Sequence, residues 1–149
     1  MDLNHLKKSY QKMLKINQSM VENRLKEKVL ANQDEIVAKV RARWREGKRP
    51  SGQIIGNYAN FSYQQEKARR NPLAQGTVDL IDTGSLSRQL VVNHLRGSFF
   101  NVFSTDSKAV DIADKYGLDV YGLTDEEASE VIREASELVM KDLIEWVDL

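Results

Sequence analysis

Three carboxylates and one lysine of this 149-residue sequence have a spacing that could support catalysis. Asp79 and Asp82 lie in the stretch VDLIDTGSLSRQL, residues 78–90, and Asp106 stands two positions before Lys108. Two carboxylates can bind a Mg²⁺ ion, and a lysine can support a water that attacks the substrate, when all three groups lie close together. One interpretation of these residues is therefore a metal-dependent hydrolytic site.

The order of these residues resembles the PD-(D/E)xK nucleases, in which D-x-K follows an apolar strand and another carboxylate lies upstream. A Mg-dependent nuclease is therefore an alternative function for the chain. Asp79 lacks the proline that precedes the first carboxylate of that family, and Asp106 stands where the N-cap of a helix is needed. The sequence contains no G-x-x-x-x-G-K-[ST], G-x-G-x-x-G, G-x-S-x-G or H-E-x-x-H motif. We therefore expect no enzymatic activity, no metal ion and no cofactor.

The same stretch has the residues of a tight turn. Asp82 or Thr83 can hydrogen-bond to its own backbone, and Gly84 permits a positive φ angle. Leucines on both sides can then anchor the turn to the core. The structural turn signature comprises Leu80, Asp82, Thr83, Gly84 and Leu86, with Leu90 as a further anchor.

The composition favours one soluble globular domain, residues 1–149. Hydrophobic residues make up 41% of the chain, cysteine is absent, and we expect neither a signal peptide nor a membrane-spanning run. The net charge of zero conceals a gradient, because residues 1–50 hold 13 Lys/Arg against 6 Asp/Glu and residues 101–149 hold 4 against 13. This asymmetry favours head-to-tail contact between copies or a basic segment facing an acidic partner. Two solvated helix faces of opposite sign would explain it equally well.

The first third of the sequence has the apolar spacing of helices. One set of residues recurs at intervals of three and four and comprises Leu3, Leu6, Tyr10 and Met13. A second set, which we call the 21–44 stripe, comprises Val21, Leu25, Val29, Ile36, Val40 and Trp44. Both sets keep to one face of a helix with 3.6 residues per turn.

Residues 1–47 are expected to form a helical arm next to an α+β core at residues 53–149. An unbroken helix over residues 2–46 would be about 65 Å long at 1.5 Å per residue, which exceeds the diameter of a small domain. Asn32 and Glu35 could begin a second helix through a capping-box-like pair. The helix either projects from the domain or folds back at this point. A projecting helix would make the 21–44 stripe a surface for contact with a partner.

The middle of the chain predicts a short helix and a β-hairpin. Residues 58–70 have helical spacing, with Tyr58, Phe61 and Ala68 facing inward. QLVVNHL and SFFNVFST are strand-like runs separated by Arg96-Gly97, which predicts an antiparallel hairpin. Because both faces of this hairpin hold apolar residues, we expect it to be largely covered.

Two further helices complete the predicted α+β fold. The first should end at Gly117 and turn Val110 inward. The second is long, reaches about Val147, and begins with a capping box of Thr124 and Glu127. Its expected inner face comprises Ala128, Val131, Ile132, Ala135, Leu138, Val139, Leu143 and Trp146.

A longer pattern spans residues 76–117. It consists of L-x-D-T-G-x-L-x-x-x-L-x-V, a glycine, an apolar strand ending in serine, and a short helix ending in Tyr-Gly. This order resembles the virion-morphogenesis and tail-completion proteins of tailed bacteriophages, which are small α+β proteins of the head–tail joint or tail that often begin with a long helix. In that family a tryptophan-containing loop often stands upstream, whereas here Gly56, Tyr58 and Phe61 hold that place and Trp44 lies earlier.

The resemblance implies a structural virion protein that acts in head–tail joining or tail completion as a subunit of the neck or tail. Its partners would be other copies of itself in a ring and portal, neck or tail proteins. It would be found in the virion and, during assembly, in the host cytoplasm. Opposite charges at the two ends of the sequence could set the register of the ring.

The basic N-terminal segment allows a different partner. It could contact DNA through phosphates alone, since it lacks interleaved aromatic residues for base stacking. A non-specific nucleic-acid-binding accessory protein is therefore a further alternative. No contact with a membrane is expected.

Overall fold

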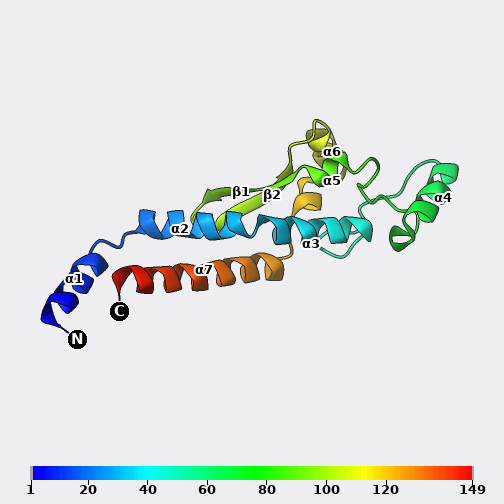
Figure 1. Ribbon diagram of the computed structural model, residues 1–149. Coiled ribbons are helices and arrows are strands. Elements are labelled where there is room, and N and C mark those ends of the chain that lie inside the picture. The colour runs from blue at the N-terminus through cyan, green and yellow to red at the C-terminus, as the bar shows by residue number, and fades with distance from the viewer. Residues whose placement is uncertain (1, 149) are drawn as a thin grey trace.

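The computed structural model describes residues 2–148 and has the α+β fold that the sequence predicts (Figure 1). In chain order the elements are α1 (Leu3–Met13), α2 (Gln18–Ala31), α3 (Gln33–Arg45), α4 (Phe61–Arg70), the 3₁₀ turn η1 (Pro72–Ala74), α5 (Ser85–Arg88), β1 (Leu90–Arg96), β2 (Phe99–Ser104), α6 (Ala109–Tyr116), the 3₁₀ turn η2 (Leu118–Tyr121) and α7 (Asp125–Val147). The N-terminal third is therefore three helices rather than one long one.

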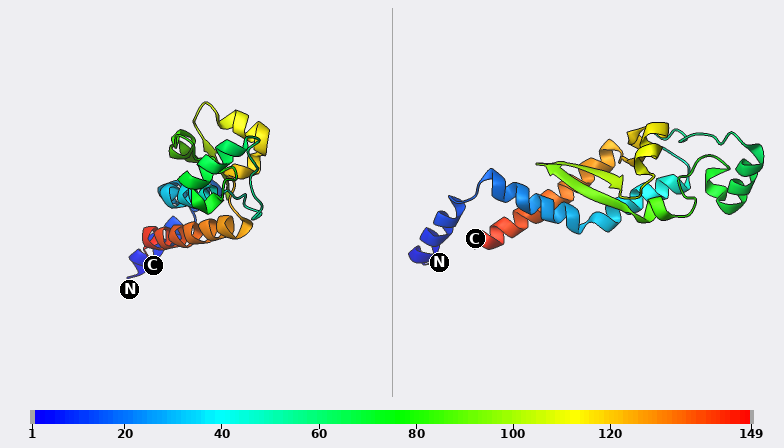
Figure 2. Two further views of the ribbon diagram at one scale, coloured as in Figure 1. Left: turned by 90° about the vertical axis from the view of Figure 1, so that its right-hand side faces the viewer. Right: turned by 90° about the horizontal axis from the view of Figure 1, so that it is seen from above.

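The elements form a slender molecule in which α2 and α3 run along the middle (Figures 1 and 2). The hairpin β1–β2 lies on one side of these two helices and α7 on the other, with α2 in contact with both α7 and β1. The chain termini lie at the same end, next to α1 (Figure 1). At the opposite end α4 projects beyond α3 (Figure 1).

The break between α2 and α3 falls at Asn32, as the sequence predicts. Asn32 has φ −95° and ψ 14°, and its side chain makes no capping hydrogen bond. The predicted capping-box-like pair with Glu35 is therefore not formed. The chain does not fold back there, and α3 continues beyond α2 after a bend that is visible from above (Figures 1 and 2).

The 21–44 stripe is part of the hydrophobic core and not a free interaction surface. Five of its six residues are buried: Leu25, Val29, Ile36, Val40 and Trp44. Val21 is 36% exposed. The prediction of a partner surface on this stripe is wrong because α7 and β1 cover α2 and α3 within the chain. For the same reason residues 18–45 belong to the core rather than to a separate arm.

Trp44 links α3 to the 3₁₀ turn η2, and η2 is linked in turn to α6. Its indole Nε1 donates a hydrogen bond to the carbonyl oxygen of Val120 at 2.8 Å. Its ring meets that of Tyr121 edge-on, with ring centroids 5.6 Å apart. Burial raises the pKa of Tyr121 to about 12, and its hydroxyl donates to the carbonyl of Ala109 at 2.9 Å.

The predicted hairpin is confirmed, with Leu90 opposite Ser104 and a register irregularity between His94 and Arg96. Its base is buried, but its tip is bare: Phe99 is 74% exposed. The expectation of a largely covered hairpin is therefore wrong for the turn end, which extends beyond the core. The outer edge of β1 is partly protected, because the backbone N–H of Val92 donates to Oε1 of Gln33 at 3.0 Å.

The inward faces of the helices agree with the sequence best where the helix is long. The capping box of Thr124 and Glu127 is formed with both hydrogen bonds, and α7 buries Val131, Ala135, Val139, Leu143 and Val147. Leu138, by contrast, is about half exposed. In the short helices Phe61 and Val110 are exposed rather than inward, since these helices have cover on only part of their surface. Among residues 2–148, no helix combines the length and the apolar character that spanning a bilayer requires.

Candidate functional site

The stretch of residues 78–86 forms the turn that its sequence predicts. Gly84 has φ 80°, a region that favours glycine because it has no Cβ. Oγ1 of Thr83 accepts a hydrogen bond from the backbone N–H of Ser85 at 3.3 Å. Leu86 is buried in the core and Leu80 packs against it. A turn is thus present at Gly84, and Thr83 is the side chain that hydrogen-bonds to its backbone.

Asp79 is buried directly before this turn. Its Oδ1 accepts from the backbone N–H of Ile81 at 3.0 Å and lies 2.7 Å from Nζ of Lys67. Its Oδ2 accepts from the amide of Asn71 at 3.0 Å. Asp79 and Lys67 are only 1% and 2% exposed, so this is a fully desolvated ion pair. Such a pair is stable only when its remaining polar atoms are hydrogen-bonded, as they are here.

Lys67 also donates to the carbonyl oxygen of Ile81 at 3.1 Å. One ammonium group therefore ties the end of α4 to both sides of the 79–81 bend. No sequence pattern predicts this role, because a lysine on a polar ten-residue helix is normally solvated. Lys67 is buried and Phe61 is exposed, so α4 does not bury the face that we expected.

Asp106 is held by a second set of hydrogen bonds. Its carboxylate accepts from the hydroxyl of Ser85, from Nε2 of Gln89 at 3.2 Å and from the backbone N–H of Lys108 at 2.8 Å. The bond from Ser85 and that from the Lys108 backbone lower the pKa of Asp106 below its usual value. Asp106 thus connects α5 to the start of α6, although it is not the N-cap that the sequence predicts.

A pocket of about 220 Å³ brings the four residues of possible chemistry together. Asp79, Asp82, Asp106 and Lys108 all line it, as the nuclease interpretation requires. Each carboxylate, however, is already engaged: Asp79 and Asp106 as described, and Asp82 at 3.5 Å from a guanidinium nitrogen of Arg70. Within residues 2–148 no group of three or more potential ligands is placed to hold a metal ion.

Tyrosines form the apolar side of the same pocket, which is lined by Tyr58, Tyr63 and Tyr116. Burial, and then the negative charge of Asp79, raise the pKa of the Tyr58 hydroxyl above its usual value. The phenol therefore stays neutral at ordinary pH and is not available as a base. Two of the carboxylates in this pocket, Asp79 and Asp106, hold the chain around the turn through the hydrogen bonds described above.

Several basic residues of α3 and of the loop after it form contacts within the chain. Arg43 donates to the carbonyl of Gly122 at 2.7 Å and pairs with Glu127. Arg49 pairs with Asp119 at 2.9 Å, and Arg41 donates to the carbonyl of Ser87 at 2.9 Å. Three of the cations expected to face a nucleic acid are therefore committed to internal contacts.

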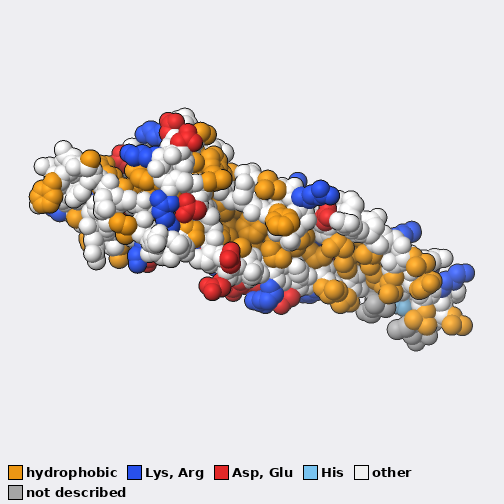
Figure 3. Space-filling model, turned by 180° about the vertical axis from the view of Figure 1, so that it is seen from behind, with side chains coloured by type: hydrophobic (Ala, Val, Ile, Leu, Met, Phe, Trp, Pro, Cys, Tyr) orange, Lys and Arg blue, Asp and Glu red, His pale blue; other side chains and the backbone are white. Residues whose placement is uncertain are grey.

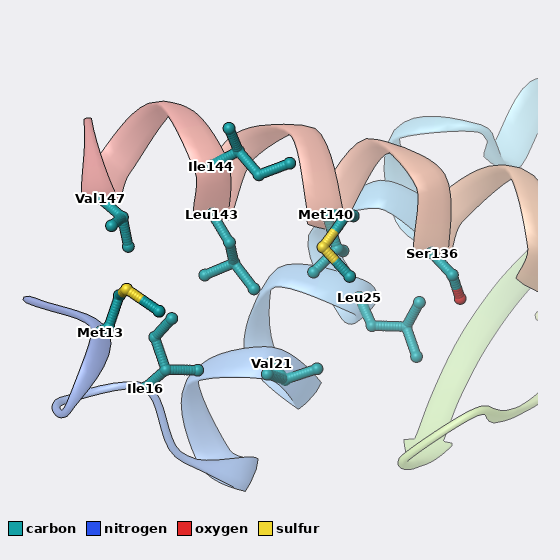
Figure 4. Close-up of a pocket in the computed structure, with 10 residues that line it drawn as sticks. Met13, Ile16, Val21, Leu25, Ser136, Met140, Leu143, Ile144 and Val147 are labelled. Carbon is teal, nitrogen blue, oxygen red and sulfur yellow. The ribbon is translucent and has the colours of Figure 1, made fainter. Parts of the chain in front are cut away.

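A second cavity, of about 510 Å³, is almost wholly apolar. Its lining comes from the end of α1, from the α1–α2 connection, from α2 and from the C-terminal half of α7 (Figure 4). We call it the α7 groove, and it is lined by Met13, Ile16, Val21, Leu25, Ser136, Val139, Met140, Leu143, Ile144 and Val147. Figure 3 shows hydrophobic side chains gathered in a band over this half of the molecule. Sequence periodicity did not predict this groove, because it forms only where α2 and α7 diverge toward α1.

Comparison with known proteins identifies no relative. No family model, no curated protein and no solved structure matches this chain. Any functional conclusion must therefore rest on the residues of this chain and on the resemblance carried by residues 76–117.

Proposed function

We propose that the protein is a non-enzymatic structural subunit of a tailed bacteriophage, placed at the head–tail joint or in the tail. The motif that carries the resemblance, residues 76–117, folds as one continuous unit of turn, α5, hairpin and α6. Leu86, Leu90, Val92 and Val102 of this unit all enter the common core. This arrangement supports the proposal because the elements of the motif are consecutive and each strand of the hairpin contributes side chains to the core.

The observation that carries the proposal is the distribution of exposed large apolar side chains over a slender molecule. They occur on α1, at the α4 end, at the hairpin tip and on η2, and include Leu3, Tyr10, Phe61, Leu73, Leu95, Phe99 and Leu118. Large exposed apolar patches on a soluble protein mark contact surfaces. The grouped residues of α1, and Leu95 with Phe99 at the hairpin tip, are the candidates for such surfaces. Two surfaces at separate places suit a subunit that meets neighbours on more than one side.

The charge gradient of the sequence does not supply the ring register that we expected from it. The basic α1 and the acidic C-terminal end of α7 lie side by side, with Nδ1 of His5 3.5 Å from the carboxylate of Asp148. Basic α2 is likewise paired with α7, through Lys28 and Asp142 at 2.7 Å. The ends of opposite sign are thus neighbours in the fold, so the charge gradient along the sequence does not by itself set the register of the copies.

The experiment that tests the proposal is imaging of the parent particle. We expect density for this chain as a ring at the portal–tail junction, in the neck, or along the tail as a terminator or minor tail protein. Peptides of the chain should also be found by mass spectrometry in purified particles. Absence of the chain from purified, infectious particles would overturn the proposal.

A Mg-dependent nuclease is the second candidate, favoured by the shared pocket of Asp79, Asp106 and Lys108. Its test is incubation of the purified protein with plasmid DNA and Mg²⁺ or Mn²⁺. Cleavage that both Asp106→Ala and Lys108→Ala abolish would establish this function in place of the structural one. Our proposal expects intact plasmid in every reaction.

A further inference from the structure

Helix α1 turns its polar side toward its own chain. Nε2 of His5 lies 3.0 Å from the carbonyl oxygen of Asp148, the Ser9 hydroxyl donates to the same oxygen at 3.3 Å, and Nζ of Lys12 donates to the carbonyl of Trp146 at 2.9 Å. These bonds satisfy carbonyl groups at the end of α7 that have no partner within their own helix. Residues 5, 9 and 12 therefore attach α1 to the chain by one side.

The apolar side of α1 is left bare. We call this side the α1 stripe, and it comprises Leu3, Leu6, Tyr10, Met13 and the adjoining Leu14, all of them exposed. Leu3 is 81% exposed and Tyr10 is 60% exposed. An isolated helix of eleven residues is marginal in water, and the stripe offers it no packing within the chain. A helix of this kind gains stability when another surface covers its apolar side.

The α7 groove has the dimensions of the α1 stripe. From Leu3 to Met13 the stripe extends about 15 Å at 1.5 Å per residue, and from Ser136 to Val147 the groove extends about 16 Å. The groove is apolar apart from Ser136. The α1 of the same chain contributes only Met13 to the lining, because its attachment through His5, Ser9 and Lys12 points the rest of the stripe away.

Charge favours the same pairing. Helix α1 holds three lysines, Lys7, Lys8 and Lys12, and no carboxylate, whereas α7 holds eight Asp/Glu against two Lys/Arg. A basic helix laid along an acidic one is electrostatically complementary. A second copy of this chain supplies such a basic helix in equal amount.

We propose that α1 of one copy lies in the α7 groove of a second copy. The stripe and the groove are different surfaces, so each copy donates one helix and accepts one. Such contacts continue from copy to copy until they close, in a reciprocal pair at the smallest. The contact does not depend on the virion assignment and is tested on the isolated protein, so that either proposal can fail alone.

The first test uses the absence of cysteine from the sequence. Two single variants, Leu6→Cys on the α1 stripe and Ile144→Cys in the groove, are mixed and oxidised. Because each variant has one thiol, a disulfide between them can only join two copies. We expect this mixed disulfide to form faster than that between Leu6→Cys and the matched control Leu118→Cys, whose side chain is exposed on η2.

The second test measures self-association by sedimentation across a wide range of protein concentration. Tyr10→Asp and Met140→Asp change exposed side chains and leave the fold intact, and each should weaken association by about tenfold or more. Val110→Asp, at an exposed position of α6 that belongs to neither surface, should leave it unchanged. A wild-type protein that stays monomeric throughout, with mixed disulfides no faster than the control, would overturn the proposal.

A membrane surface is the competing occupant of a basic, apolar helix. Vesicles of phosphatidylcholine and phosphatidylglycerol provide the probe. We expect the protein not to float with these vesicles. Flotation that Tyr10→Asp abolishes, with no self-association, would assign the α1 stripe to a lipid surface and overturn the contact between copies.

Discussion

The first third of this chain contains two apolar stripes with similar helical spacing, of which one is buried and the other is exposed. The 21–44 stripe is buried between the hairpin and α7. The α1 stripe, built from residues of the same kind, faces solvent. The difference shows that periodicity identifies the apolar side of a helix but not what covers it, because the cover comes from elements distant in the sequence.

The comparison is tested most strongly by truncating one large side chain in each stripe. Trp44→Ala should lower the free energy of unfolding by about 3–5 kcal/mol, since it leaves a cavity and removes the hydrogen bond to Val120. Tyr10→Ala, the matched change on α1, should alter it by no more than about 0.5 kcal/mol in dilute protein. Urea unfolding followed by circular dichroism measures both. A Tyr10→Ala effect equal to that of Trp44→Ala would mean that α1 is packed on its own chain.

The contrast between covered and bare groups extends to charges. Lys67→Met leaves the carboxylate of Asp79 buried without its ion partner, and should cost about 3–5 kcal/mol of unfolding free energy. Arg70→Met removes the exposed pair with Asp82 and should cost far less, because solvent screens that pair. The double variant Lys67→Met/Asp79→Leu should recover part of the loss. Equal effects of the two single substitutions in urea unfolding would count against a desolvated pair.

Helix ends sharpen the comparison at a smaller scale. Thr124→Ala removes one bond of a formed capping box at the start of α7 and should cost about 1 kcal/mol. Asn32→Ala changes a helix start whose side chain makes no capping bond, and should stay within about 0.5 kcal/mol. Both values come from chemical denaturation. A larger loss at Asn32 than at Thr124 would contradict the observed hydrogen bonding.

The smallest expected effect concerns the ion pair between Lys28 of α2 and Asp142 of α7. The hydrogen bond from Lys28 lowers the pKa of Asp142 below its ordinary value of 3.8. Because the folded pKa is depressed, the stabilisation is present above 3.8 and is lost as the pH falls through the folded value. Asp142→Asn should therefore lose less stability than wild type when unfolding is measured from neutral pH into this acid range. If the free energy of unfolding falls with pH to the same extent in both proteins, the ion pair of Asp142 makes no such contribution.

Local chemistry allowed much of the fold to be predicted. The hairpin, the turn at Gly84, the capping box at Thr124 and the interruption at Asn32 each depend on a few adjacent residues, and all are present. The packing of α7 against α2 could not be predicted, because it depends on two segments about a hundred residues apart. The same limit explains why the 21–44 stripe was interpreted as a partner surface.

The candidate site was predictable only in part. The nuclease interpretation requires Asp79, Asp106 and Lys108 to lie close together, and the structure brings them to one pocket. The sequence did not reveal Lys67, which neutralises Asp79. The apolar spacing of α4 predicts that Phe61, and not Lys67, faces inward. Nor did the sequence reveal the α7 groove, which is made by the divergence of two helices and has no pattern of its own.

The meeting of the two chain ends at α1 has a practical consequence for labelling. An affinity tag or fluorescent domain fused to either terminus would sit beside the α1 stripe and the α7 groove, and would obstruct both at once. Gly52, in the loop after α3, has no atom within 4 Å of a Cβ built on it, so this exposed loop has more room for an insertion than either terminus. The same closeness of the ends makes the chain suited to circular permutation, with the old termini joined by a short linker and new ones opened near Gly52.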